Sequence, residues 1–287
     1  MFVPVHGTQF DESRLRGSTL VLPSQCIGLS AYIGMELFIL NTSMERVGFY
    51  KSDYVSPIVV NDNMTLPGQP LGQVQMPAEV YFSAEHNMTF LMIRSGPTGG
   101  MRRFADELVA FIMSTDFAKV VILTATGSPV SRERDSNRHI PEVFAYCNNF
   151  MFKANRDYYN QNGIRKFGYW IQDVKRRPHQ ELAELSAAGW ADRLMKSFNR
   201  MEKPAILFTI FCPGAIDFVG GYNYFQFLKQ NMFGNPAEQT TQRLGRLTLS
   251  TADVPLETGE QIHELLFLNN QDRVKIPQGW IQAANYF

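Results

Sequence analysis

Cysteine is scarce in this chain of 287 residues. Its three cysteines, Cys26, Cys147 and Cys212, lie far apart and form no CxxC pair. An odd number of scattered cysteines is typical of a protein from a reducing compartment. Cys212 follows the apolar run 206–211. We therefore expect it to be a buried, unreactive thiol rather than a nucleophile.

A charge excess of either sign is also lacking. The sequence has 27 Lys and Arg residues against 27 Asp and Glu residues, so its formal net charge is zero. No overall basic excess is available to hold a phosphate backbone, which disfavours nucleic acid as the main partner. Low net charge also removes one barrier to association with other proteins.

Long apolar runs are absent as well. No stretch approaches the roughly 20 apolar residues that cross a bilayer, so we expect no membrane partner. Residues 1–7 lack the basic and long apolar regions of a signal peptide. The sequence therefore predicts a cytoplasmic and nuclear protein.

Motifs of catalysis or cofactor binding are not found either. No two of the five histidines have the spacing of metal ligands, and no GxSxG motif occurs. The glycine-rich segment 95–100 precedes an expected helix, but Pro97 removes one N–H donor that a phosphate would need. We interpret this segment as a tight turn, and we expect no metal and no cofactor.

What the sequence does contain is an alternation of apolar strands and helices. This alternation predicts one α/β domain over residues 1–287, with a mostly parallel sheet. The expected strand 119–124 contains the apolar run 120–123, which is typical of a central strand buried on both faces. The other expected strands are 19–23, 47–50, 57–60, 79–83, 89–94 and 205–211, and the expected helices are 31–40, 104–115, 190–201, 219–232 and 262–268.

Two segments rich in aromatic residues have more than one interpretation. Residues 153–177 mix basic and aromatic side chains, which suits a partly buried helix with a solvated basic edge, a protein interface or a site for single-stranded RNA. The expected helix 219–232 and its neighbour Phe233 are compatible with core packing or a subunit interface. Its aromatic side chains include Tyr222, Tyr224, Phe225 and Phe227.

The chain ends in Asn285, Tyr286 and Phe287. A penultimate tyrosine at a free carboxyl end can fill an apolar slot while the carboxylate pairs with a basic group. A frayed tail is the alternative interpretation of these three residues alone.

Short segments with a consistent order and spacing run along nearly the whole chain. In that order they resemble the proteasome assembly chaperone 2 family, whereas 148–185 and 235–257 depart from its pattern. The matching segments are 1–4, 20–23 with Gly28, 35–37, 47–50 with Asp53, Val55 and Pro57, 78–81, 91–95, 118–123, and 275–277 with Trp280.

The resemblance implies a three-layer α/β/α sandwich similar to nucleoside phosphorylases, without their catalysis. It implies a chaperone that forms a heterodimer with proteasome assembly chaperone 1 and holds the α-ring of the proteasome core particle, preventing off-pathway α-ring dimers. A hydrophobic–Tyr–any ending that docks between α subunits is implied for the tail 275–287. Here Tyr286 and Phe287 fit this ending, whereas Asn285 stands where a hydrophobic residue belongs.

Two other functions remain open from the sequence. A nucleoside phosphorylase-like or hydrolase-like enzyme is the first alternative, because the expected fold is shared with such enzymes. An RNA-binding module centred on residues 153–177 is the second.

Overall fold

The computed structural model describes residues 1–5, 10–42, 44–61, 74–126, 143–154, 156–157, 165–166, 189–212 and 216–232. In this part of the chain, nine strands form one sheet in the order β1-β3-β6-β7-β2-β8-β11-β9-β10. The strands are β1 (Phe2–Pro4), β2 (Thr19–Pro23), β3 (Glu45–Tyr50), β6 (Ala78–Ser83), β7 (Met88–Ile93), β8 (Lys119–Thr126), β9 (Val143–Cys147), β10 (Arg165–Lys166) and β11 (Ala205–Phe211).

The centre of the sheet is parallel. Strands β7, β2, β8 and β11 lie next to one another and run in one direction, with Leu20 opposite Val120 and Val120 opposite Ala205. Antiparallel strands β6 and β9 flank this block. The predicted central strand 119–124 thus lies between two parallel neighbours, which confirms its position.

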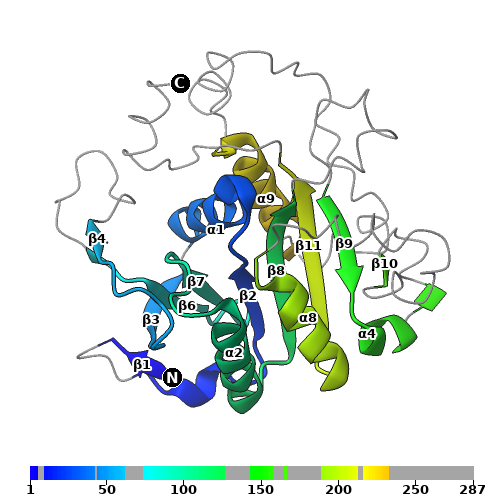
Figure 1. The fold of residues 1–287 in the computed structure, drawn as a ribbon, viewed down its shortest axis with the longest axis horizontal. Coiled ribbons are helices and arrows are strands. Elements are labelled where there is room, and N and C mark those ends of the chain that lie inside the picture. Colours follow the sequence, from blue (N-terminus) through cyan, green and yellow to red (C-terminus); the bar gives the residue numbers. More distant parts are fainter. Residues whose placement is uncertain are drawn as a thin grey trace.

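Helices cover both faces of the sheet (Figure 1). Helices α2 (Met101–Thr115) and α8 (Ala191–Arg200) pack into one core cluster, whereas α1 (Ser30–Asn41) and α9 (Phe218–Met232) pack into the other. The strands alternate between the two clusters, with Leu20 and Leu22 in the first and Val21 in the second. Because side chains of a strand point to opposite faces in turn, each apolar strand supplies both cores. The predicted α/β/α sandwich is confirmed.

The connection after β2 is less regular than the sequence pattern suggests. Helix α1 joins β2 to β3, and the strand pairings make these two strands run in the same direction. They are not neighbours, because the hairpin β6–β7 lies between them. Its two strands were predicted at residues 79–83 and 89–94 and are confirmed as an antiparallel pair.

Helices α1 and α9 approach each other closely at glycines. A Cβ atom at Gly34 would lie 2.4 Å from the Cβ of Tyr224 and 2.9 Å from the carbonyl oxygen of Gly221. Tyr224, Phe225 and Phe227 are buried in the second core. Core packing is thus confirmed for these three residues, and the partly buried Tyr222 packs against the same core. Phe233 lies outside the described residues.

Several other predictions have clear outcomes. Helices 104–115, 190–201 and 219–232 and strand 205–211 are confirmed as α2, α8, α9 and β11. Of the expected strand 57–60, only Val60 is part of a strand, β4 (Val60–Asn61), which pairs with β5 (Val74–Gln75). Strands β1, β9 and β10 and helix α4 (Asn149–Ala154) were not predicted. The expected helix 262–268 lies outside the described residues.

Among the described helices, none combines the length and the hydropathy that crossing a membrane requires.

Candidate partner-binding site

The site predicted from the sequence, Asn285, Tyr286 and Phe287, lies outside the described residues, as does the whole tail 275–287. Most of the basic and aromatic segment 153–177 also lies outside them. Its described residues Lys153 and Arg156 are exposed at and just beyond the end of α4. A solvated basic edge agrees with this exposure, and the protein and RNA interpretations of the segment stay predictions.

An enzyme of this fold class would bind its ligand at the carboxyl ends of the parallel strands. Ser24 directly follows β2, and its backbone N–H donates to the carbonyl of Leu123 over 2.8 Å. Its hydroxyl accepts a hydrogen bond from the N–H of Ala191 at the start of α8, over 3.1 Å. Gly189 lies so close to this loop that a Cβ atom there would be 2.0 Å from the carbonyl oxygen of Gln25. The backbone before α8 thus packs directly onto the end of β2.

Asp217 occupies the other side of the same edge. Its carboxylate accepts hydrogen bonds from the N–H of Gly220 over 2.8 Å and from the hydroxyl of Ser30 over 3.1 Å. Its own N–H donates to the carbonyl of Gly28 over 2.8 Å. The aspartate therefore caps α9 and ties it to the start of α1.

Cys26 follows the carboxyl end of β2 by three residues. Burial raises its pKa to about 11, which keeps it protonated and weakly nucleophilic at neutral pH. Cys147 and Cys212 are buried, as predicted for Cys212. Within the described ranges, no group of three His, Cys, Asp or Glu side chains could hold a metal ion.

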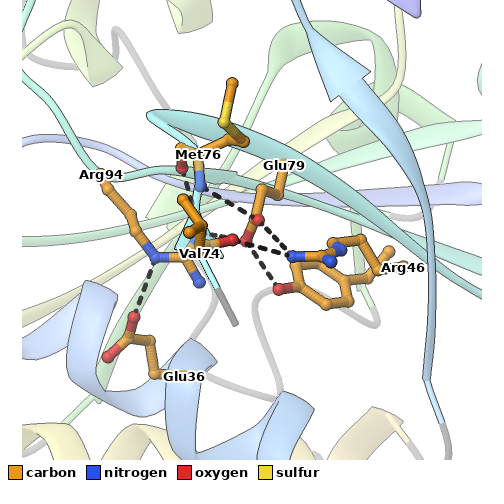
Figure 2. A network of polar contacts seen from close by, with 7 residues as sticks. Glu36, Arg46, Val74, Met76, Glu79 and Arg94 are labelled. Atoms are coloured by element: carbon orange, nitrogen blue, oxygen red, sulfur yellow. Dashed lines mark hydrogen bonds and ion pairs between the residues drawn. The ribbon is translucent and has the colours of Figure 1, made fainter. Parts of the chain in front are cut away.

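A buried ion cluster, which sequence reasoning missed, lies between α1 and the β3–β6–β7 part of the sheet (Figure 2). We call it the Glu79 cluster; it comprises Glu36 of α1, Arg46 of β3, Glu79 and Tyr81 of β6, and Arg94, which directly follows β7. The Glu79 side chain is fully buried, and those of Glu36 and Arg94 are 4% and 6% exposed. Arg46 is the more open cation, with 32% of its side chain exposed.

Glu79 accepts hydrogen bonds with both carboxylate oxygens. Its Oε1 receives Arg46 Nη1 over 2.9 Å, while its Oε2 receives Arg94 Nη1 and, over 2.7 Å, the Tyr81 hydroxyl. Arg94 Nε also donates to Glu36 over 3.1 Å. Two carboxylates and two guanidinium groups balance their charges, which burial without pairing would make costly.

The charges of the cluster shift the ionisation of its members. Burial by itself would lower the pKa of the Arg94 guanidinium, but the charges of Glu36 and Glu79 raise this pKa above its ordinary value. Burial, and then the negative charge of Glu79, raise the pKa of Tyr81 above its ordinary value. Arg94 therefore stays charged and Tyr81 stays neutral at physiological pH.

The cluster also binds the backbone that leads into β6. The N–H of Met76 donates to Glu79 Oε1 over 3.1 Å, and Arg46 Nη1 donates to the carbonyl of Val74 over 3.3 Å. Both groups belong to a small projecting element, formed by residues 56–61 and 74–77, that we call the β4–β5 arm. In Figure 1, its strand β4 lies away from both helix layers. The cluster thus sets where the arm leaves the sheet.

The arm carries exposed apolar side chains. Ile58, Val59 and Val74 are 58%, 52% and 43% exposed. In the sequence, the Glu79 cluster was indicated only weakly, for example by Glu36, the single charged residue of an otherwise uncharged helix. The arm was not indicated, because it has too few residues to show the alternation of apolar and polar residues that marks a strand.

Comparison with known proteins gives a consistent result. The model of the PAC2 family matches residues 20–211, a stretch that begins in β2 and ends with β11. Proteasome assembly chaperone 2 of Nematostella vectensis is 29% identical over 128 residues, which are 44% of this chain and 52% of the relative. Proteasome assembly chaperone 2 of Bos taurus is 26% identical over 129 residues, or 45% of this chain and 48% of the relative.

The alignments cover about half the length of these curated relatives. Among solved structures, Pyrococcus furiosus PbaA, an archaeal homolog of proteasome-assembly chaperone, superposes with a TM-score of 0.54 at 16% identity. The superposition covers 88% of this chain and 91% of PbaA. At this identity the likeness concerns the fold, and it extends over most of both chains.

Proposed function

The chain belongs to the PAC2 family, and we propose that it is a non-enzymatic chaperone for assembly of the proteasome core particle. The observation that carries the proposal is the family match over residues 20–211, which includes the whole parallel centre of the sheet. The curated relatives that bear the name proteasome assembly chaperone 2 support it.

In this proposal, the chain acts as a heterodimer with proteasome assembly chaperone 1 on the α-ring, in the cytoplasm and the nucleus. It prevents off-pathway α-ring dimers. Asn285, Tyr286 and Phe287 enter a pocket between α subunits, where the phenol and the terminal carboxylate are held. Fully extended, a segment as long as the seven residues after Trp280 would span roughly 23–25 Å, enough to reach a surface pocket from a docked body.

The polar groups at the carboxyl edge of the sheet support a binding role over catalysis. Ser24 and Asp217 hold backbone segments together, and the raised pKa of Cys26 keeps its thiol protonated. The alternative from the sequence, a nucleoside phosphorylase-like or hydrolase-like enzyme, would need such groups for its substrate. Phosphorolysis or hydrolysis of a nucleoside by the purified chain would contradict the chaperone proposal.

Affinity purification from native cells tests the proposal directly. The tag belongs at the N-terminus, so that the carboxylate of Phe287 stays free. We expect mass spectrometry to find a second chaperone and proteasome α subunits, with few mature β subunits. Recovery of the chain alone, or of RNA or metabolic enzymes, would contradict the assembly role.

Deletion of Tyr286 and Phe287 tests the tail separately. We expect the α subunits to be lost from the purified complex while the second chaperone is retained. Gln278→Ala, which leaves the last three residues intact, is the matched control. If the shortened chain retains the α subunits as well as the control does, the tail is not the docking element.

A further inference from the structure

The β4–β5 arm gathers exposed apolar side chains on one small element. Ile58 and Val59 directly precede β4, and Val74 of β5 lies opposite Asn61 of β4. All three are β-branched and more than 40% exposed. Elsewhere in the described ranges, large apolar residues with high exposure belong to separate elements or loops; they are Met1, Leu29, Met101, Phe150, Met201 and Ile216. A local group of exposed apolar residues marks an interaction surface more strongly than single ones do.

The arm carries no charge of its own. Its residues 56–61 and 74–77 include no Asp, Glu, Lys or Arg. Arg46 donates to the carbonyl of Val74, and Arg94 Nη1 donates to the carbonyl of Met76 over 3.4 Å. Both cations are paired with carboxylates inside the Glu79 cluster. A phosphate backbone or an anionic lipid would therefore find no unpaired cation from these two residues. An uncharged, apolar protein surface is the complementary partner, because the centres of protein interfaces are depleted of charge.

The arm is also held in place before any partner arrives. A ladder of two residue pairs is too short to be stable on its own. The Glu79 cluster holds its second strand through Val74 and Met76. In the segment that leads into β4, the carbonyl of Ser56 accepts a hydrogen bond from the hydroxyl of Ser95 over 3.1 Å. Preorganisation of this kind reduces the entropy that is lost on binding.

The edges of the large sheet are poorer candidates for a partner. In the described part of the chain, one edge strand is β1, which has three residues and includes the exposed Pro4. The other is β10, which consists of Arg165 and Lys166. Short strands, proline and charged residues at an edge all disfavour pairing with another chain.

We propose that the β4–β5 arm, through Ile58, Val59 and Val74, docks onto an apolar, uncharged surface of the second chaperone subunit. This inference rests on the proposed function, in which that subunit and this chain form a heterodimer. Obligate subunit interfaces are large and apolar, whereas contacts that must be released are more polar. The apolar arm therefore suits the subunit contact within the chaperone pair rather than a contact with the α-ring.

The test is co-expression of the full chain with tagged proteasome assembly chaperone 1 and measurement of the dissociation constant of the pair. The arm variant carries Ile58→Thr, Val59→Thr and Val74→Thr, which keep β-branched shapes but remove apolar surface. The control variant carries Met201→Thr and Ile216→Thr, whose parent side chains are 51% and 50% exposed elsewhere. We expect the arm variant to bind at least about tenfold more weakly than the wild type, and the control to bind like the wild type.

Each other outcome has a definite meaning. A pair that forms equally well with the arm variant overturns the docking role and leaves the proposed function standing. Equal weakening by arm and control variants also overturns it. If the wild-type chain forms no pair, both proposals fall. Binding of the wild type to uncharged phosphatidylcholine vesicles, lost in the arm variant, would identify a lipid surface and overturn the protein partner.

Discussion

Glu79→Ala is the substitution that most directly tests the energetic role of the Glu79 cluster. It removes the carboxylate that accepts hydrogen bonds from Arg94, Arg46, Tyr81 and the N–H of Met76. Arg94 then keeps Glu36 as its charged partner, although its side chain is only 6% exposed. Arg46 can return to water because it is 32% exposed, but the Tyr81 hydroxyl and the Met76 N–H lose a buried acceptor.

The expected cost is large because one partner of a buried ion pair is removed. Breaking such a pair costs about 3–5 kcal/mol of unfolding free energy, mostly from the charge left behind. Asp106→Ala is the matched control, since it removes a carboxylate from the Arg193–Asp106 pair, whose side chains are 36% and 54% exposed. An exposed pair contributes about 0–1 kcal/mol, so this control is expected to change stability little.

Urea unfolding followed by tryptophan fluorescence measures both variants on the full chain. Trp190, which is 1% exposed and packs edge-on against Phe104, reports the loss of the core between α2 and α8. We expect a clear decrease in the unfolding midpoint for Glu79→Ala and almost none for Asp106→Ala. If Glu79→Ala costs no more than the control, the cluster is not a buried, mutually dependent unit and our reasoning about the arm's anchor fails.

Two further predictions concern packing and pH. Gly34→Ala places a methyl group against Tyr224 and Gly221, so we expect the free energy of unfolding in urea to decrease by about 1–3 kcal/mol. The control, Ala110→Ser on the exposed face of α2, is expected to change it by less than about 0.5 kcal/mol. Equal effects of the two substitutions would contradict the close contact between α1 and α9. At alkaline pH, burial raises the pKa values of Tyr81 and Tyr224 in the folded chain, so the unfolded chain loses these phenol protons first, near pH ~10. The stability that the two neutral phenols contribute is therefore fully present below that pH and decreases above it, by up to about 1.4 kcal/mol per pH unit for each tyrosine. We expect Tyr81→Phe to reduce this slope. A urea unfolding midpoint that stays constant up to about pH 11 would refute the burial of these phenols.

The regular elements were largely predictable because each has its own periodicity. The strand 119–124 has an apolar run that is typical of a strand buried on both faces. The structure places it between β2 and β11. The helix 104–115 has apolar residues on one face, and they pack into the first core. Residues 57–60 were a weaker prediction, because four residues bounded by proline leave little pattern, and only Val60 pairs as a strand.

The candidate site was hardly predictable, since it is assembled from distant residues. Glu36 and Arg94 are 58 positions apart in the sequence, and Arg46 and Glu79 are 33 apart. A single charged residue in or beside an apolar run does not by itself indicate which residue it pairs with. The predicted site at Asn285–Phe287 rests on the sequence and the family resemblance alone and stays a prediction.

The amino-acid sequence alone determined the order of most strands and helices, the apolar faces and the balance of charge. These properties follow from local chemistry, because a side chain's hydropathy and its spacing from the next apolar residue act within one element. Only the tertiary structure decided which element covers which. It inserted the hairpin β6–β7 between β2 and β3, and it buried the aromatic face of α9 against the sheet. It also brought two carboxylates and two guanidinium groups together, because a charge leaves water only where packing supplies its partner.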